Sequence, residues 1–259
     1  MKKSDFIEAL AELKLNNTNS YLVHVSLIGL GKFEDLKIKD INKFLLNSLQ
    51  KFLGKKCTIS TLTPFYEYAD HNEEFDIKKS LPSKQIGSFS KFFFKKKNSY
   101  RSFNPLFNIC SIGPNAKKIT RNVATSDFGK QSTWENLYNL NTNMIFIGCD
   151  LSKCTFIRYI EHRFKVPYLI NKLFYTKIKA GNKTLYSSFS STLRNLNLNI
   201  NYNTKKFQDI LKKKGLLKIS SNKNFTLMSV NMKPAFKIGT DCLKRNLYFF
   251  LDRKTLKKT

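Results

Sequence analysis

The residues best suited to chemistry stand near the middle of the chain, where Thr155, Arg158 and Glu161 follow one another at intervals of three. On a helix, side chains three positions apart lie on the same side, so each neighbouring pair can touch. An arginine keeps its proton in proteins, so Arg158 cannot take a proton from another group. It can instead pair with Glu161 or bind an anionic ligand, and an ordinary surface ion pair is the competing explanation.

A second group of candidates surrounds a glycine-containing turn. His24 and Ser26 come near the end of an apolar run that predicts a strand, and Gly29 follows shortly after. Backbone amides at such a turn can bind phosphate groups, whereas the alternative is a core histidine before an ordinary turn. Arg101 and Ser102 are either further ligand contacts or parts of a structural turn.

Other polar residues have simpler explanations. Ser132 and Glu135 have the spacing of a capping box, in which the hydroxyl accepts from a helical amide and the carboxylate accepts from the cap residue's own amide. His162 lies one position beyond Glu161, about 100° further round the helix, so it would not replace a base at position 158 directly. His71 is a further candidate base.

Apolar periodicity predicts the elements that must position these residues. We expect helices over residues 4–13, 40–54, 206–214 and 235–247, and helices that begin at Ser83 and Thr155. We expect strands over residues 21–27, 57–62, 107–112, 144–148 and 195–203, and a hairpin over 216–230 around Ser221-Asn222-Lys223-Asn224. Residues 63–79 are polar and turn-rich, which predicts a long loop.

Short motifs follow one another over residues 20–170: Val23-His24-Val25-Ser26-Leu27, Gly29, Gly31, Pro82-Ser83, Gly87, Arg101-Ser102-x-Asn104-Pro105, Ile112-Gly113-Pro114, Phe128-Gly129-Lys130-x-Ser132, Ile147-Gly148, Thr155-x-x-Arg158-x-x-Glu161 and Val166-Pro167-Tyr168. None is specific alone. The ordered set resembles the aminoglycoside 3-N-acetyltransferase family, also called the antibiotic N-acetyltransferase family, and most closely its branch linked to surface-polysaccharide amino sugars. The resemblance implies a single α/β domain over residues 1–259, with a central mixed sheet flanked by helices.

The resemblance also implies an N-acyltransferase that uses acetyl-CoA as donor and transfers the acetyl group directly to an amino group on a sugar ring. It assigns cofactor binding to His24, Ser26, Gly29, Arg101 and Ser102, and the catalytic positions to Thr155, Arg158 and Glu161. The family has a histidine as general base three residues after the threonine, where this chain has Arg158. The proton acceptor must then be sought among Glu161, His162, His71 and His24.

Composition limits the other classes of function. The formal net charge is +28, with lysines spread along the chain, which an A/T-rich genome or attraction of an anionic ligand would each explain. We find no helix-turn-helix, zinc-finger or RNA-binding signature, so nucleic acid is not an expected partner. No stretch approaches the ~20 apolar residues of a membrane span. The five scattered cysteines predict reduced thiols in a cytoplasm and no metal site.

Charge also separates the possible acceptors. A strongly basic protein attracts anionic nucleotide-linked sugars and repels polycationic aminoglycosides. We therefore expect a nucleotide-linked or surface-polysaccharide amino sugar as the small-molecule partner, with aminoglycosides as the alternative. A catalytically impaired member that only binds CoA or a sugar is a further alternative because of Arg158. The sequence leaves the oligomeric state open.

Overall fold

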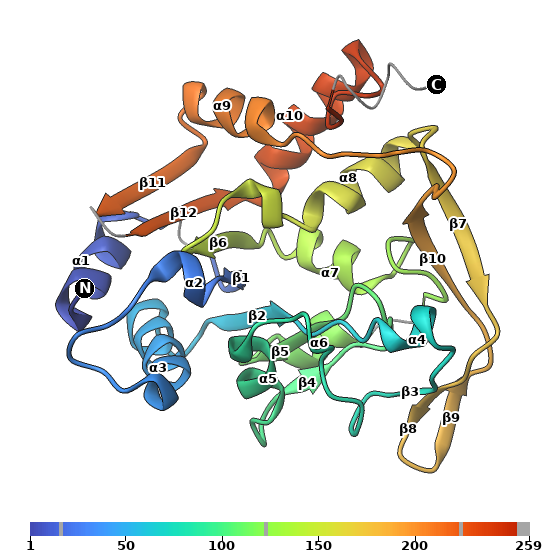
Figure 1. The fold of residues 1–259 in the computed structure, drawn as a ribbon, viewed down its shortest axis with the longest axis horizontal. Helices are drawn as coiled ribbons and strands as arrows, with labels where there is room; N and C mark the ends of the chain where they lie inside the picture. Colours follow the sequence, from blue (N-terminus) through green and yellow to red (C-terminus); the bar gives the residue numbers. More distant parts are fainter. Residues whose placement is uncertain (16–17, 122–123, 223–224, 253–259) are drawn as a thin grey trace.

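A computed structural model describes residues 1–15, 18–121, 124–222 and 225–252 (Figure 1). Its centre is a seven-stranded mixed sheet in the order β11-β12-β6-β1-β2-β5-β4. These strands are β1 Ser20–Val25, β2 Thr58–Leu62, β4 Tyr100–Arg101, β5 Ile109–Ile112, β6 Asn143–Ile147, β11 Leu217–Asn222 and β12 Phe225–Asn231. Strands β6, β1 and β2 run parallel, and the other neighbours in the sheet pair antiparallel.

Helices cover both faces of this sheet, which explains why β1 and β6 are nearly continuous apolar runs. On one face Tyr21 and Val23 pack with residues of α1 Lys3–Glu12, α3 Ile41–Leu53 and α5 Ser88–Phe94. On the other face Leu22 and Phe146 pack with residues of α6 Ala116–Thr120, α7 Thr133–Asn139, α8 Phe156–Phe164, α9 Lys205–Lys213 and α10 Met232–Arg245. The expected α/β architecture, a central mixed sheet flanked by helices, is confirmed.

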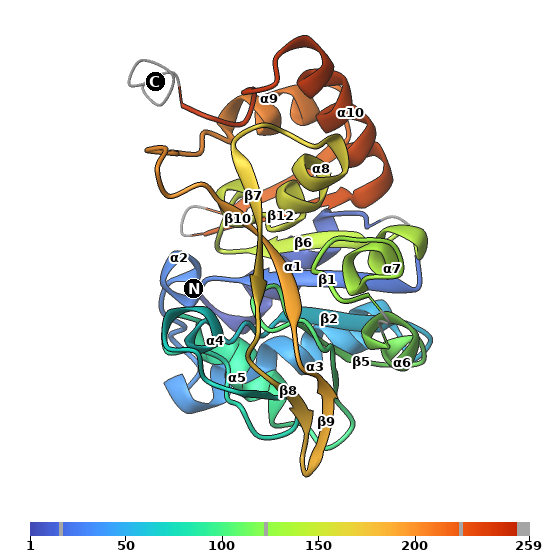
Figure 2. The same cartoon turned by 90° about the vertical axis from the view of Figure 1, so that its right-hand side faces the viewer.

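Smaller elements extend beyond the main sheet. Strand β7 Leu169–Phe174 pairs antiparallel with β10 Phe189–Arg194, and β3 Phe75–Asp76, β8 Ile178–Ala180 and β9 Lys183–Tyr186 form a three-stranded sheet. Figure 2 shows the β7–β10 ribbon running past the main sheet, from α8 to the β8–β9 hairpin. A separate apolar cluster fills the space beneath it, with Tyr68 of α4 Glu67–Asp70 against Phe174.

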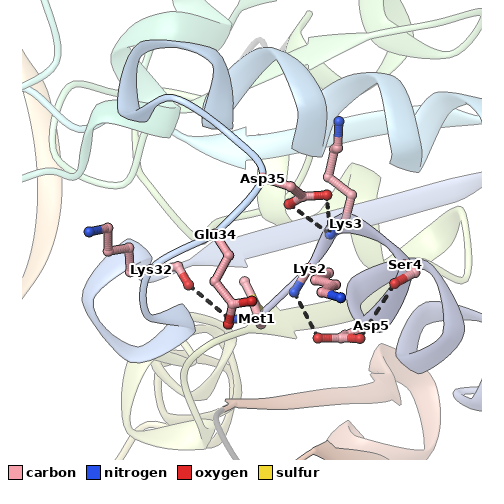
Figure 3. Close-up of polar contacts among 8 residues, drawn as sticks. All are labelled: Met1, Lys2, Lys3, Ser4, Asp5, Lys32, Glu34 and Asp35. Carbon is pink, nitrogen blue, oxygen red and sulfur yellow. Dashed lines mark hydrogen bonds and ion pairs between the residues drawn. The ribbon is translucent and has the colours of Figure 1, made fainter.

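The first residues are held against the segment after α2 Leu27–Leu30 (Figure 3). The amino group of Met1 donates to the carbonyl of Lys32 at 3.0 Å and pairs with Glu34 Oε1 at 3.1 Å. The amide of Lys3 donates to the carboxylate of Asp35 at 3.1 Å. These contacts fix the start of α1 beside the chain that leads through the short 3-10 helix Ile38–Asp40 into α3.

Most of the expected helices and strands are confirmed, with ends that differ by a few residues. Helices α1, α3, α8, α9 and α10 and strands β2, β5 and β6 lie where apolar periodicity places them. The β11–β12 hairpin also forms, although Lys223 and Asn224 of its expected turn lie outside the described residues. Within the described ranges, no helix has both the length and the apolar character needed to cross a bilayer.

Two local predictions are wrong, and one confirmed strand ends earlier than expected. The strand over 195–203 does not form: among the described residues it pairs only through a single bridge between Tyr202 and Leu251, and Leu196 is 91% exposed. Strand β1 stops at Val25, before Leu27, because Ser26 caps the short helix α2. Helix α5 begins at Ser88 rather than Ser83, because the Ser83 hydroxyl accepts from the amide of Tyr66 at 2.7 Å and also donates to Glu67.

The predicted loop over residues 63–79 is also more ordered than its composition suggests. It contains α4 and the short strand β3, which pairs with β8. Apolar contacts explain this order, since Phe65 stacks on Phe75 with ring centroids 5.7 Å apart and both rings are buried.

Candidate active site

One edge of the main sheet collects the ends of several elements that carry candidate residues. Because β6, β1 and β2 are parallel, their carboxyl ends lie at the same edge, where α/β proteins commonly bind ligands. Ser26 follows β1 there, and the loop that leads to Thr155 follows β6. Strand β5 begins at this edge, since Ile109 pairs with Leu62. Ser102 lies beside it, because its backbone amide donates a hydrogen bond to the Ile109 carbonyl at 2.9 Å.

A pocket of about 590 Å³ opens at this edge. Its walls come from the turn after β1, the loop after β6 and the start of β12, and are formed by Ser26, Gly29, Gly148, Cys149, Asp150, Ser152, Lys153, Phe225, Thr226 and Met228. Two predicted cofactor-binding residues, Ser26 and Gly29, thus line one cavity. Lys153, in the 3-10 helix Leu151–Lys153, adds a cation to it.

Two glycines bring the walls of this pocket into direct backbone contact. A Cβ at Gly29 would lie 1.9 Å from the Gly148 carbonyl oxygen. Gly148 has a φ of +64°, and a Cβ there would lie 2.4 Å from the Leu30 amide nitrogen and 2.5 Å from the Ser26 carbonyl oxygen. Gly29 therefore has a structural function at the pocket, because only glycine allows this close approach.

His24 lies beneath the pocket with its side chain in the core. Its ring packs against Phe146 at a tilt of 34°, with centroids 4.7 Å apart, and the Cys149 thiol donates to its backbone carbonyl at 3.7 Å. Burial lowers the pKa of His24 to about 4, so the imidazole is neutral at pH 7. Among the described residues, Nε2 meets no hydrogen-bond partner.

Arg101 and Ser102 are buried in a network that braces the loop before β5. Arg101 Nε donates to Asn108 Oδ1 at 2.7 Å, and Nη2 donates to the Thr63 carbonyl at 2.6 Å. The Ser102 hydroxyl donates to Asn104 Oδ1 at 2.6 Å and accepts from the Ile109 amide at 2.9 Å. Both side chains already have partners within the protein. Direct contact of Arg101 and Ser102 with a ligand stays a prediction.

The predicted ion pair between Arg158 and Glu161 is present, and the hydroxyl groups of two tyrosines donate to the same carboxylate. Arg158 Nη1 lies 3.3 Å from Glu161 Oε2, the Tyr168 hydroxyl donates to Oε1 at 2.6 Å, and the Tyr202 hydroxyl donates to Oε2 at 3.0 Å. Arg158 also donates to the Tyr202 oxygen, and its guanidinium lies 4.1 Å from the centre of the Tyr202 ring. We call these four residues the Glu161 cluster.

The electrostatics of this cluster reflect its burial. Glu161 has no exposed surface, and burial raises its pKa to about 7, while Arg158 and the Tyr168 hydrogen bond act in the opposite direction. Burial lowers the pKa of Arg158, with Glu161 opposing that effect. The arginine stays protonated. Glu161 is therefore a carboxyl group that can change protonation near neutral pH.

The remaining candidates lie apart from the cluster. His162 Nδ1 lies 2.8 Å from Thr192 Oγ1, and its ring centroid is 5.8 Å from that of Phe128, so the ring belongs to another side of α8. His71 ends α4 and is exposed. Thr155 directly precedes the first turn of α8, and its carbonyl accepts from the Arg158 amide at 2.9 Å.

Ser132 caps α7 as expected, but only half of the capping box forms. Its hydroxyl accepts from the Glu135 amide at 3.2 Å. The Glu135 carboxylate accepts instead from the amide of Gln131 at 2.6 Å, one residue before the cap.

Sequence patterns missed two members of the Glu161 cluster. Tyr168 stands in the Val166-Pro167-Tyr168 motif, which could have marked it. Tyr202 had no such signal, because it lies within residues 195–203, where the polar–apolar alternation predicts a strand that does not form. Only the folded chain brings it to α8.

Two of three comparisons with known proteins agree with this fold. The family profile described as aminoglycoside 3-N-acetyltransferase matches residues 22–244. A comparison with curated protein sequences finds no match.

Solved structures share the fold at low identity. The apoenzyme of aminoglycoside acetyltransferase AAC(3)-IVa has a TM-score of 0.77 and 20% identity over 99% of this chain and 93% of its own. A histidine-to-alanine mutant of that enzyme in complex with a gentamicin gives the same values. The binary complex of AAC-IIIb with CoASH has a TM-score of 0.77 and 16% identity over 95% of this chain and 97% of its own.

Proposed function

Because the chain belongs to the aminoglycoside 3-N-acetyltransferase family, we propose that it transfers an acetyl group from acetyl-CoA to an amino group of an amino sugar. The observation that supports this proposal is the Glu161 cluster, in which a buried carboxyl group with a pKa of about 7 pairs with Arg158. A cytoplasmic location and action as a single domain over residues 1–259 are parts of the same proposal.

The pocket beside Ser26 is the proposed binding site of the donor. A structural neighbour is described in complex with CoASH. The pocket is polar, its volume of about 590 Å³ suits part of a CoA molecule, and Lys153 supplies a positive charge for a phosphate. Ser26, Gly29 and Gly148 would contact the donor directly, and His24 would support the pocket from within through its contact with Cys149. Arg101 and Ser102 would contribute by bracing the loop before β5.

The reaction needs a neutral amine, an oriented thioester carbonyl and a group that receives the amine proton. Arg158 cannot receive it, because its guanidinium keeps its proton. Glu161 is the group that we propose receives the amine proton. Arg158 holds its carboxylate, and Thr155 lies at the start of the same helix. In this arrangement the arginine orients the carboxylate and compensates its charge.

The neighbours favour aminoglycosides as acceptors, since one is described in complex with a gentamicin and another with apramycin. A polycationic acceptor must approach a protein with a net charge of +28, which opposes the encounter at low salt. Because the neighbours are described with aminoglycosides, we propose aminoglycoside-type amino sugars as the first acceptor class to examine despite this repulsion.

One observation favours a second acceptor class, the nucleotide-linked or surface-polysaccharide amino sugars. Arg158 is partly exposed, and within the described part of the chain neither Nε nor Nη2 donates a hydrogen bond. These two nitrogens carry three N–H groups, which suit the carboxylate or phosphate of an anionic acceptor. The net charge would also attract that acceptor.

Release of free thiol from acetyl-CoA tests the proposal. The protein is incubated with gentamicin, apramycin and a panel of nucleotide-linked amino sugars, and the acetylated product is identified by mass. We expect thiol release that requires an acceptor amine. Tight binding of acetyl-CoA without turnover on any acceptor would instead identify a non-catalytic CoA-binding protein.

Arg158→Gln distinguishes the two acceptor classes. If Arg158 binds an anionic group, its loss raises KM for a nucleotide-linked sugar about tenfold or more and leaves KM for an aminoglycoside nearly unchanged. Equal effects on both acceptors would mean that Arg158 acts only on Glu161. Lys165→Gln, at the carboxyl end of the same helix, is the control for loss of one positive charge.

A further inference from the structure

The Tyr202 hydroxyl occupies the space between Arg158 and Glu161. It donates to Glu161 Oε2 at 3.0 Å and accepts from Arg158 Nη1. Tyr202 lies in the segment between β10 and α9 and is held there by a bridge to Leu251. Its ring lies against the guanidinium, 4.1 Å from ring centre to central carbon. The hydroxyl is thus fixed from two sides.

This position leaves one acceptor site of the hydroxyl unused. A tyrosine hydroxyl has one proton and two lone pairs. The proton goes to Glu161 and one lone pair accepts from Arg158. No other described residue donates to the oxygen, so the second lone pair is open to a ligand. Tyr202 is partly exposed, whereas Glu161 is fully buried, so Tyr202 is the member of this pair that a substrate meets first.

We propose that Tyr202 and Glu161 form a proton relay that replaces the missing histidine, with Tyr202 as the group that contacts the acceptor amine. This inference rests on the proposed function and names the residue that performs one of its steps. Tyr202 would be a catalytic residue, and Glu161 would act through it.

The relay balances atoms and charges. The neutral amine attacks the thioester carbonyl carbon, a C–N bond forms, and the carbonyl electron pair moves to oxygen. One N–H proton passes to the Tyr202 oxygen while the Tyr202 proton passes to Glu161 Oε2. As the carbonyl reforms, the C–S bond breaks, and the leaving thiolate receives one proton back from Glu161 through Tyr202. The products are the amide and free CoA, and both side chains return to their initial states.

The charges around the relay suit this role. Arg158 stabilises negative charge on the Tyr202 oxygen during transfer, and Arg194 adds a second positive charge near Arg158. Tyr168 donates to the other carboxylate oxygen and stabilises the ionised form, and Tyr248 stacks on Tyr168 with ring centroids 5.8 Å apart. Burial raises the pKa of Glu161 to about 7, close to where a general base is most effective.

Tyr202→Phe tests the relay, because it keeps the ring against Arg158 and removes only the hydroxyl. We expect kcat to fall by roughly 100-fold or more, the usual contribution of a general base, with KM for acetyl-CoA unchanged. The melting temperature is measured to show that the variant folds. A kcat within about threefold of wild type would overturn the relay.

Tyr168→Phe is the matched variant, since it also removes one hydroxyl bonded to Glu161 but from a fully buried residue. Losing that donor raises the pKa of Glu161, so the acidic limb of the pH–rate profile should move to higher pH with a plateau rate of the same order. If Tyr168→Phe and Tyr202→Phe lowered the plateau equally, Tyr202 would only position Glu161.

A wild type that acetylates no acceptor would overturn the proposed function and the relay with it. An active wild type with an equally active Tyr202→Phe would overturn the relay alone.

Discussion

Asp127 is a single residue whose burial has consequences for the whole fold. Its carboxyl group has no exposed surface, and neither oxygen meets a donor at hydrogen-bonding geometry within the described residues. Burial raises the pKa of Asp127 to about 7, and the nearby side chains of Ser191 and Asn104 moderate that effect. A buried carboxyl without good partners is more stable protonated than ionised.

The folded state therefore binds this proton more tightly than the unfolded state, so stability falls as pH rises from about 4 to about 7. The loss of unfolding free energy over this pH range is at most about 4 kcal/mol. Asp127→Asn removes the charge at similar size, so it should stabilise the protein at pH 8 by roughly 1–3 kcal/mol and have little effect at pH 5.

Urea unfolding at pH 5 and pH 8 measures this difference. Asp150→Asn is the control, because Asp150 is exposed and its carboxylate caps a short helix. An Asp127→Asn protein that lost stability at pH 8 would show that the ionised carboxylate has stabilising partners after all.

Residue-level prediction from sequence succeeded where the partners are close in the chain. The spacing of three between Arg158 and Glu161 was enough to predict their ion pair. The third partner, Tyr202, lies 44 residues from Arg158 along the chain. No periodic pattern links residues so far apart, because their contact depends on how α8 and the segment after β10 pack.

At the scale of elements, the sequence predicted the buried strands and missed the exposed ones. Strands β1 and β6 are covered on both faces, and their apolar runs identified them. Strands β7 and β10 were missed because they form a two-stranded ribbon away from the main sheet, and β7 exposes most of its residues. The segment over 195–203 alternates polar and apolar residues but gains no partner strand, so its pattern gave a false strand.

Gly148 holds the loop after β6 against the turn after β1, which together form walls of the pocket. Gly148→Ala and Gly215→Ala introduce the same methyl group at nearly equal φ, +64° and +67°. The Gly148 methyl would meet backbone atoms at 2.4–2.5 Å, whereas nothing lies within 4 Å of the Gly215 position. We expect Gly215→Ala to cost about 1–2 kcal/mol of unfolding free energy, from the left-handed backbone alone. Gly148→Ala should cost more than about 3 kcal/mol, because the backbone around Ser26 must move.

Chemical denaturation of both variants checks this comparison. The Gly148 variant should also bind acetyl-CoA more weakly, since the walls of the pocket separate. Equal losses of stability would mean that the turn after β1 yields easily and that Gly148 matters only for its backbone conformation.

At the scale of the whole molecule, the net charge of +28 should govern encounter with the anionic donor. We expect kcat/KM for acetyl-CoA to fall by roughly tenfold as salt rises from low to high ionic strength, because screening shortens the reach of the attraction. Steady-state rates of thiol release at a series of salt concentrations measure this fall in kcat/KM.

Two lysine variants show how local this attraction is. Lys153→Gln should reduce the salt dependence, because Lys153 lines the pocket. Lys51→Gln, on the exposed side of α3, should reduce it less. A salt dependence that neither change affects would assign the attraction to the overall charge.

The position of β12 between β11 and β6 has a consequence for translation. The ribosome delivers β1, β2 and β6 long before it delivers Phe225, Thr226 and Met228, which close one side of the pocket. Until then β6 lies at the border of an incomplete sheet, with β1 as its neighbour and its other side without a strand. A nascent chain that carries every predicted catalytic residue is therefore still unable to form the complete donor pocket.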